Sequence, residues 1–429
     1  MPSSTPPDRS RPARRRLAPF ALPLAALLLF ALGAAVALAD EPAGVLGERF
    51  PQQLAALRRV FLPAVFKPAP PPPPTPTRTP TRTPTRGPAP TPSATATPTP
   101  LPEPSIAYGV NQASAEGLPI TKQMGMRWIK GFANWSEMER SRGQINWQSL
   151  DFLVGQAQQQ GFKMLVRVDR VPEWASGSAN TTTPPRNPDD FGNFAEQLAT
   201  RYRGRIHVYE IWNEPNLNYE FGDQRPDPAR FVGILKAVYP RIKRADPNAV
   251  VIAGALSTSG DRDDAGVIGD LIYLQRMYNA GVKGSFDAMG THPYGGPNSP
   301  DTPTAPGGLV FNRAKEQHDV MLANGDESPM WATEFGWVAN TPCDLGYFNQ
   351  FKISEDLQAQ YLVRAFEKAR TEWPWMKGMF IFNVDFGIVS WYPECRFERF
   401  FSIAYRATPG SGPILYRPAF EALKNMPKP

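Results

Sequence analysis

Histidine and cysteine are scarce in this chain, which has three histidines and two cysteines among 429 residues. Because no CxxC pair occurs, zinc fingers and thioredoxin-like redox motifs are excluded. No GxGxxG and no P-loop follows the first predicted strand, which counts against a nucleotide-binding sheet. The acidic run at 261–264 lacks the glycine and the distal glutamate of a calcium loop. We therefore expect neither a metal ion nor a cofactor.

An excess of basic charge is also missing from most of the chain. The formal net charge of +6 arises in residues 1–104, which hold 12 basic and 5 acidic residues. Residues 105–429 hold 34 basic and 35 acidic residues and are close to neutral. The charge distribution therefore does not indicate a nucleic-acid partner.

The first 39 residues have the pattern of an export signal. Residues 1–16 form a basic tail that ends in three arginines, and an uncharged apolar stretch follows at 17–39. Cleavage near Ala39 would release a secreted protein, whereas the uncleaved stretch is long enough to anchor the chain in a membrane. The arginines would hold the tail in the cytoplasm. Both alternatives predict that the rest of the chain is extracytoplasmic.

Two further segments precede the globular part of the chain. Residues 40–66 carry a few spaced apolar residues and are predicted to form a short juxtamembrane segment. Residues 67–104 are rich in proline and threonine and contain the repeat Thr-Pro-Thr-Arg. Proline at this density forbids a helix and favours extended polyproline II. We interpret this segment as a disordered linker.

From residue 105 onward, strand-like and helix-like segments alternate. The predicted strands are 106–111, 127–135, 163–171, 206–213, 249–256, 286–294, 330–336 and 376–386. The predicted helices are 119–124, 148–160, 191–203, 228–245, 268–280, 313–324, 354–370 and 418–426. Eight strands that alternate with eight helices predict a parallel sheet closed into an α/β (β/α)₈ TIM barrel over 105–429. An open doubly wound sheet is the competing architecture.

Two glutamates lie at the ends of predicted strands. Glu214 follows the fourth strand, which is stopped by Pro215, and Glu334 ends the seventh. In an eight-stranded barrel these positions face each other across the C-terminal end, where such enzymes keep their active sites. Two opposed carboxylates are what cleavage of a glycosidic bond requires.

Several short motifs lie near predicted strand ends: Asn213-Glu214-Pro215, His292-Pro293-Tyr294, Glu334-Phe335-Gly336 and the segment at 135–140. They resemble motifs of the "4/7" clan of retaining glycoside hydrolases, which includes cellulases, mannanases, xylanases and β-xylosidases. The resemblance spans 105–429 and is nearest to family 39 and family 5. The arginine that cellulase-like members carry near strand two has no clear match. Arg167 and Arg170, on strand three, are the nearest substitutes.

The resemblance implies a role for five residues. Glu214 would be the general acid/base and Glu334 the nucleophile. Asn213 would bind the sugar 2-hydroxyl, Tyr294 would donate a hydrogen bond to Glu334, and His292 would line the same site. On a regular strand Asn213 and Glu214 point to opposite faces, so we expect an irregular strand end beside Pro215.

Other residues near predicted strand ends are candidates for sugar contacts. Trp135 and Trp337 offer flat aromatic faces, although packing in the core is an alternative for each. Asn383 and Asp385 would either touch substrate or satisfy loop backbone. Cys343 and Cys395 follow strands seven and eight, so that they would lie at the same end of the barrel, either as a disulfide or as two thiols.

The sequence therefore predicts an extracytoplasmic glycoside hydrolase that cleaves β-linked glycans with retention. The expected partners are an oligo- or polysaccharide and, through residues 17–39, a membrane. A non-catalytic carbohydrate-binding module on the same barrel and a transglycosylase are the alternatives.

Overall fold

A computed structural model describes residues 106–112, 114–305 and 307–429 of the chain. The predicted basic tail, the signal or anchor stretch, the juxtamembrane segment and the linker, which together make up 1–104, lie outside the described residues. Within the described ranges, no helix is both long and apolar enough to cross a lipid bilayer.

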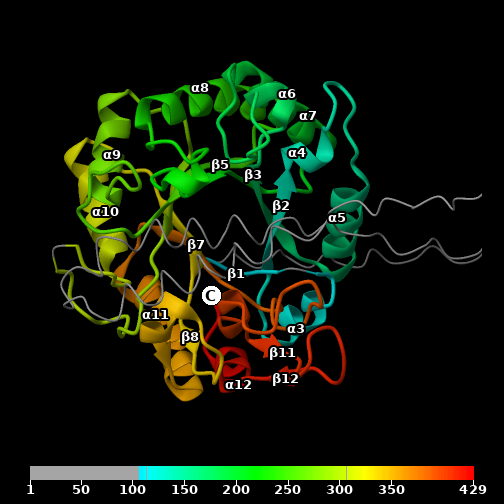
Figure 1. Ribbon diagram of the computed structural model, residues 1–429, viewed down its shortest axis with the longest axis vertical. Coiled ribbons are helices and arrows are strands. Elements are labelled where there is room, and N and C mark those ends of the chain that lie inside the picture. The colour runs from blue at the N-terminus through cyan, green and yellow to red at the C-terminus, as the bar shows by residue number, and fades with distance from the viewer. Residues whose placement is uncertain (1–105, 113, 306) are drawn as a thin grey trace, which may run out of the picture. The chain divides into compact units, whose positions relative to one another are not determined.

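Eight parallel strands close into a barrel in the order β1-β10-β7-β6-β5-β4-β3-β2 (Figure 1). Their bounds are β1 Ala107–Asn111, β2 Trp128–Asn134, β3 Lys163–Asp169, β4 Val208–Asn213, β5 Val250–Ser257, β6 Ala288–His292, β7 Met330–Phe335 and β10 Met376–Ile381. The predicted (β/α)₈ TIM barrel is therefore confirmed, and the open sheet is excluded. The last strand ends earlier than expected, and residues 382–386 begin a long loop.

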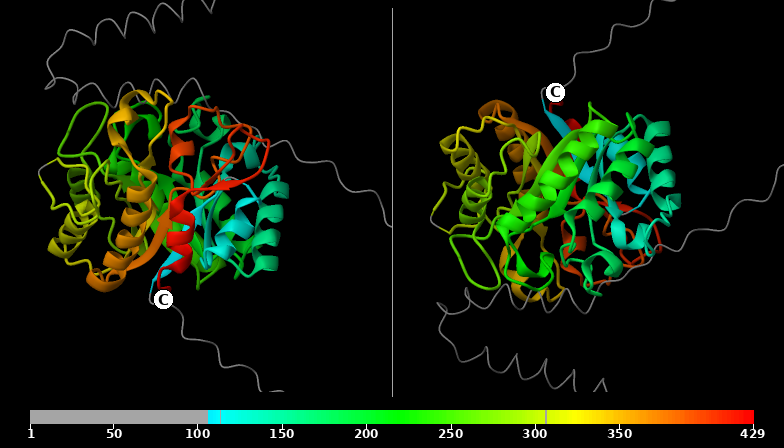
Figure 2. Two further views of the ribbon diagram at one scale, coloured as in Figure 1. Left: turned by 90° about the horizontal axis from the view of Figure 1, so that it is seen from below. Right: turned by 90° about the horizontal axis from the view of Figure 1, so that it is seen from above.

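Helices surround the strands (Figure 2). The longer ones are α3 Gly117–Gln123, α5 Gln148–Gln160, α7 Pro188–Arg201, α8 Pro228–Ala245, α9 Asp270–Asn279, α10 Arg313–Ala323, α11 Glu355–Glu372 and α12 Pro418–Asn425. Local sequence fixes several ends. The Asp227 side chain caps α8 by accepting from the backbone of Arg230, and Gly161 ends α5 in the left-handed region.

The loops contain several short helices and strands. They are the helices α4 Trp135–Met138 and α6 Glu173–Ser176, three 3-10 helices (Asn218–Glu220, Gly346–Phe351 and Phe397–Phe400), and the two-residue strands β8 Val338–Ala339, β9 Lys352–Ile353, β11 Ala404–Tyr405 and β12 Leu415–Tyr416. The sequence pattern did not predict these elements because each has six residues or fewer, too few for a hydrophobic period to repeat clearly.

One apolar side chain from each barrel strand forms a closed layer inside the barrel. Trp128 and Trp331 pack edge to face in it, with ring centroids 5.6 Å apart. The full layer comprises Ala107, Trp128, Leu165, Val208, Ile252, Ala288, Trp331 and Phe380. Because side chains alternate along a strand, the next inward position of several strands lies one layer closer to the C-terminal end. These positions carry the polar residues described below.

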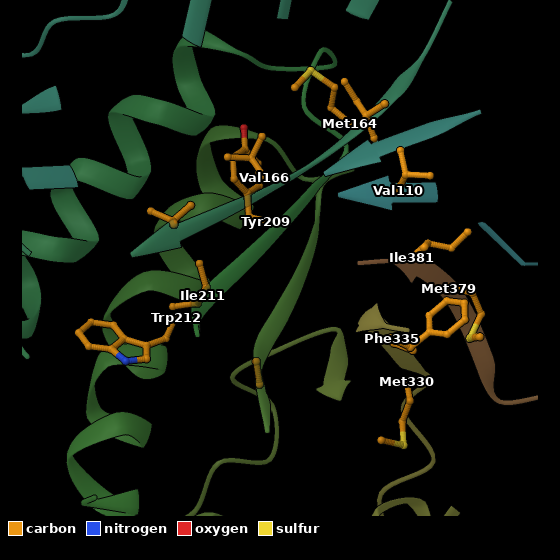
Figure 3. Packing of buried hydrophobic residues seen from close by; sticks show 14 of the residues in the cluster. Val110, Met164, Val166, Tyr209, Ile211, Trp212, Met330, Phe335, Met379 and Ile381 are labelled. Carbon is orange, nitrogen blue, oxygen red and sulfur yellow. The ribbon is translucent and has the colours of Figure 1, made fainter. Parts of the chain in front are cut away.

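A second, larger apolar cluster joins the strands to the helices. Val166 on β3, and Tyr209 and Ile211 on β4, belong to it (Figure 3). Phe194 and Leu198 of α7 contribute to the same cluster. The odd positions of β4 thus face the helices, whereas Val208 faces the interior, as the two-residue period of a strand requires.

Close backbone contact between β4 and β5 depends on Gly254. A Cβ atom at this position would lie 2.4 Å from the carbonyl oxygen of Ile211 and 3.1 Å from that of Trp212. Backbone atoms of a central strand cannot move aside at low cost. Gly254 therefore permits the irregular end of β4, which carries candidate site residues.

We predict that Gly254→Ala lowers the free energy of unfolding by about 1–3 kcal/mol, the usual cost of overpacking. Gly233→Ala in α8 is the matched control, because its added Cβ would meet nothing within 4 Å. There alanine should raise the free energy of unfolding by about 0.5–1 kcal/mol. Urea unfolding of both variants measures the difference. Equal stability of the two would contradict the role given to Gly254.

Candidate active site

The end of β4 is irregular, as expected beside Pro215. Trp212 has φ +78° and Glu214 has φ +40°, both in the left-handed region. By alternation the Trp212 side chain would face the interior, but it lies in the outer apolar cluster. Asn213 and Glu214 then both contact residues of the barrel interior: Asn213 Oδ1 accepts from Arg167 at 2.8 Å, and Glu214 Oε1 lies 3.0 Å from His292 Nδ1.

A bulge near the end of β7 likewise lets Glu334 contact the barrel interior. The register with β10 pairs Ala332 with Met379 and Phe335 with Ile381, so that two β7 residues oppose one β10 residue. Thr333 and Glu334 therefore both contact interior residues. Thr333 Oγ1 donates to Glu210 at 2.5 Å, and Glu334 Oε1 lies 3.1 Å from Lys130 Nζ.

The buried His292 ring at the end of β6 links both glutamates. Its Nδ1 lies 3.0 Å from Glu214 Oε1 and 3.9 Å from Glu334 Oε2. Its Nε2 lies 3.1 Å from Thr333 Oγ1. Glu214 and Glu334 are each 7 % exposed, whereas His292 is fully buried. Side chains from β4, β6 and β7 thus meet at the C-terminal end of the barrel.

Tyr294 lies two residues beyond His292 and is half-buried. Its hydroxyl donates to Glu334 Oε2 at 3.0 Å, which is the hydrogen bond that the resemblance implied. The ring packs edge to face against Phe382 and Phe401. The tyrosine is therefore held in place by the loop that follows β10.

Two cations contact Glu334 from neighbouring strands. Lys130 on β2 is fully buried and reaches Glu334 Oε1, and Arg167 on β3 lies 3.5 Å from the same oxygen. Arg167 is one of the two expected substitutes for the missing arginine, whereas Arg170 forms an ion pair with Glu220 at 3.0 Å. Lys130 was not predicted. Its only sequence signal is a lysine in the middle of a mostly apolar strand.

This arrangement sets the charge of several side chains. Burial favours the neutral form of Glu334, but Lys130, His292 and Arg167 hold its pKa far below its ordinary value. Burial likewise opposes ionisation of Glu210, yet Lys130 and His292 lower its pKa to about 2. Burial disfavours a charged His292, but the Glu334 carboxylate and the contacts with Glu210 and Glu214 raise its pKa to about 9.

The structure does not bring Trp135 and Trp337 into the site, and the expectation that they bind sugar is corrected. Trp135 is fully buried, stacks on Phe194 and donates its indole hydrogen to Glu139. Trp337 is 1 % exposed and donates to the Asn298 carbonyl. Both serve as core residues, because large aromatic side chains bury more apolar area there than at the surface.

Asn383 and Asp385 hold loops together instead of facing the site. Asn383 donates to the carbonyl of Glu398 and accepts from the backbone of Phe386. Asp385 accepts from both the backbone and the hydroxyl of Ser114. Both side chains are fully buried. Of the two alternatives, satisfaction of loop backbone is the one that the structure shows.

Cys343 and Cys395 form a disulfide in the structure. It ties the loop after β7 to the loop after β10. Among the described residues no cluster of histidine, cysteine and carboxylate side chains could hold a metal ion.

A closed (β/α)₈ barrel with two glutamates at the ends of its fourth and seventh strands defines a class of glycoside hydrolases. A family model described as cellulase (glycosyl hydrolase family 5) matches residues 93–362, more than half of the chain. The chain belongs to this family. The predicted membership in the "4/7" clan is therefore confirmed.

A curated protein is similar to part of the chain. Endo-1,4-beta-xylanase 3 of Hypocrea jecorina is 25% identical over 182 residues, which cover 41% of this chain and 50% of that protein. The chain thus spans about half the length of the curated relatives it matches.

Solved structures show the same fold. A family 39 glycoside hydrolase from Bacteroides cellulosilyticus WH2 has a TM-score of 0.56 and 19% identity, covering 75% of this chain and 63% of that one. A family 39 β-xylosidase from Caulobacter crescentus has a TM-score of 0.53 and 17% identity, with coverages of 74% and 70%.

The pKa shifts predict how stability depends on pH. Glu210 stabilises the fold fully above its ordinary pKa of 4.5, and this contribution is lost as pH falls toward 2. His292 contributes fully below its ordinary pKa of 6.5, and its contribution is lost as pH rises toward 9. We therefore expect maximal stability between these two ordinary values. Above pH 6.5 the titration of His292 should lower the free energy of unfolding by at most about 1.4 kcal/mol per pH unit.

Urea unfolding at a series of pH values tests this expectation. His292→Gln should abolish the decrease in the free energy of unfolding between pH 6.5 and 9. His318→Gln is the control and should retain it, because burial lowers the pKa of His318, which therefore titrates below that range. An unchanged slope in His292→Gln would show that another group is responsible.

Proposed function

We propose that this protein is an extracytoplasmic glycoside hydrolase that cleaves β-linked glycans with net retention. Glu334 is the nucleophile and Glu214 the general acid/base. The observation that carries the proposal is the meeting of these two carboxylates, from β4 and β7, around one ring nitrogen of His292. Two carboxyl groups on opposite sides of a sugar are the minimal equipment for this reaction.

In the first step a Glu334 oxygen attacks the anomeric carbon while the bond to the leaving oxygen breaks. Glu214 gives its proton to that oxygen, and a glycosyl ester forms on Glu334. Lys130, Arg167 and the Tyr294 hydroxyl, all in contact with the Glu334 carboxylate, hold it ionised and oriented before the attack.

In the second step Glu214 removes a proton from water, and the water oxygen attacks the anomeric carbon and releases Glu334. The configuration is inverted twice and is therefore retained. The distances from His292 Nδ1 show that the two carboxylates are close neighbours. The proposal of retention rests on the motifs around Glu214 and Glu334 that resemble those of the "4/7" clan, whose members form such a glycosyl ester.

Asn213 is proposed to bind the sugar 2-hydroxyl. Its side-chain oxygen accepts from Arg167, so the amide nitrogen is directed by a cation that also contacts Glu334. A hydrogen bond to the 2-hydroxyl that tightens in the transition state contributes to the rate of such reactions. The asparagine and the nucleophile are thereby aligned through one guanidinium.

A β-linked xylan or a related plant polysaccharide is the substrate class we favour. The support is the partial match to an endo-1,4-beta-xylanase and the family assignment. Trp391, on the loop after β10, is 43 % exposed and packs on Tyr392 at a centroid distance of 4.6 Å. An exposed aromatic face of this kind suits the C–H face of a sugar ring.

The domain organisation is part of the proposal. Residues 105–429 form the catalytic domain, and 67–104 are a linker to a signal or anchor segment at 17–39. The disulfide between Cys343 and Cys395 supports an oxidising compartment outside the cytoplasm.

The function is tested with aryl β-glycosides and β-linked polysaccharides. We expect Glu334→Gln to lower kcat on the order of 10⁴–10⁶-fold, as loss of a nucleophile does. Glu214→Gln should lower it about 10²–10⁴-fold on polysaccharide. On an aryl glycoside whose phenol is acidic the loss should be smaller, because that leaving group needs no proton.

Glu421→Gln, at an exposed position of α12, is the control and should keep full activity. Proton NMR of the first product should show the β-anomer. Saturable sugar binding without turnover, unchanged in the variants, would replace this proposal with a carbohydrate-binding module.

A further inference from the structure

A fully buried ion pair lies beneath the two proposed catalytic glutamates. Lys130 Nζ is 2.7 Å from Glu210 Oε2, and both side chains are completely inaccessible to solvent. The same ammonium is 3.1 Å from Glu334 Oε1. One buried cation is therefore shared between two carboxylates, only one of which is the proposed nucleophile.

Glu210 has further contacts with the residues around the site. Its Oε1 accepts from Thr333 Oγ1 and lies 3.7 Å from His292 Nε2. Thr333 directly precedes Glu334 in the β7 bulge, and His292 contacts Glu214. The groups that face the Lys130–Glu210 pair are Arg167 from β3, His292 from β6, and Thr333 and Glu334 from β7.

We propose that Glu210 is a positioning residue that keeps Lys130 paired while Glu334 loses its charge. This inference rests on the function proposed above. When the glycosyl ester forms, Glu334 becomes neutral, and Lys130 would be left as a buried, unpaired cation if Glu334 were its only partner. An uncompensated buried charge is costly, whereas a pair that keeps one partner is not.

The same pair also moderates the nucleophile before the reaction. With Glu210 ionised, Lys130 divides its attraction between two carboxylates, so Glu334 is held ionised without being bound by a full positive charge. Without the Glu210 charge, Lys130 would bind Glu334 alone. That would stabilise the free carboxylate and penalise the ester, and both effects raise the barrier of the first step.

The first step is measured as the burst of phenolate from a dinitrophenyl β-glycoside, using the full chain. We expect Glu210→Gln to slow the burst about tenfold to a hundredfold, the range of coupling between contacting buried groups. Glutamine keeps the size of the side chain and can still accept from Thr333. We expect the KM to change much less than the burst rate.

The decisive control is the double variant Lys130→Met with Glu210→Gln, which removes both charges at once. It should recover part of the rate lost in Glu210→Gln, and its Tm should be higher than that of either single variant. Lys130→Met alone leaves the Glu210 anion beside Glu334 without its ammonium partner, with only the more distant His292 to offset its charge. The acidic limb of its pH–rate profile should therefore move to higher pH, and the double variant should move it back.

Additive losses in the double variant, with no recovery of rate, would overturn the proposal and leave the pair a structural one. If Glu210→Gln does not fold, Lys130→Met is compared with the double variant. Removal of the Glu210 anion, which has lost its ammonium partner, must then restore activity. An inactive parent protein overturns the proposed function itself. That outcome is distinct, because the variants are then never slower than the parent.

Discussion

Charges inside the barrel must be paired, and the arrangement of the site follows from this constraint. Above the closed apolar layer, the interior holds Lys130, Glu210, His292 and Glu334, each buried or nearly so. An isolated ion in such a place costs several kcal/mol. The side chains therefore fix one another, at 2.7 Å for Lys130–Glu210 and 3.1 Å for Lys130–Glu334. The ionised state of the proposed nucleophile is a consequence of this pairing.

Two local departures from regular strand geometry bring the glutamates together. A left-handed Trp212 sends its own side chain outward and leaves Asn213 and Glu214 to contact interior residues. The bulge in β7 does the same for Glu334 next to Thr333. In regular strands, alternation would turn one member of each adjacent pair toward the helices. The regular strands form the barrel, and these two irregularities bring Glu214 and Glu334 to its interior.

The hydrophobic periods of the sequence were sufficient to predict the eight strands, the eight longer helices and the positions of Glu214 and Glu334 at strand ends. His292 and Tyr294 were identified as site residues only through the resemblance to the "4/7" clan. The contribution of Lys130 was missed because its partner Glu334 lies 204 residues further along the chain, and a lone lysine in an apolar strand carries no sign of that pairing. Glu210 was hidden in the same way. Trp135 and Trp337 were predicted to contact sugar but are buried in the core. Their exposure depends on how helices pack over the strand ends, and the sequence alone does not specify that packing.

Covalent capture of the intermediate tests the central claim most directly. A 2-deoxy-2-fluoro glycoside with a dinitrophenyl leaving group slows the second step, so the sugar should accumulate on the nucleophile. We expect mass spectrometry of the digested protein to find one sugar per chain, attached to Glu334. A sugar on any other residue, or turnover of the natural substrate with no trapped ester, would contradict the roles given to Glu334 and to the charge pair beneath it.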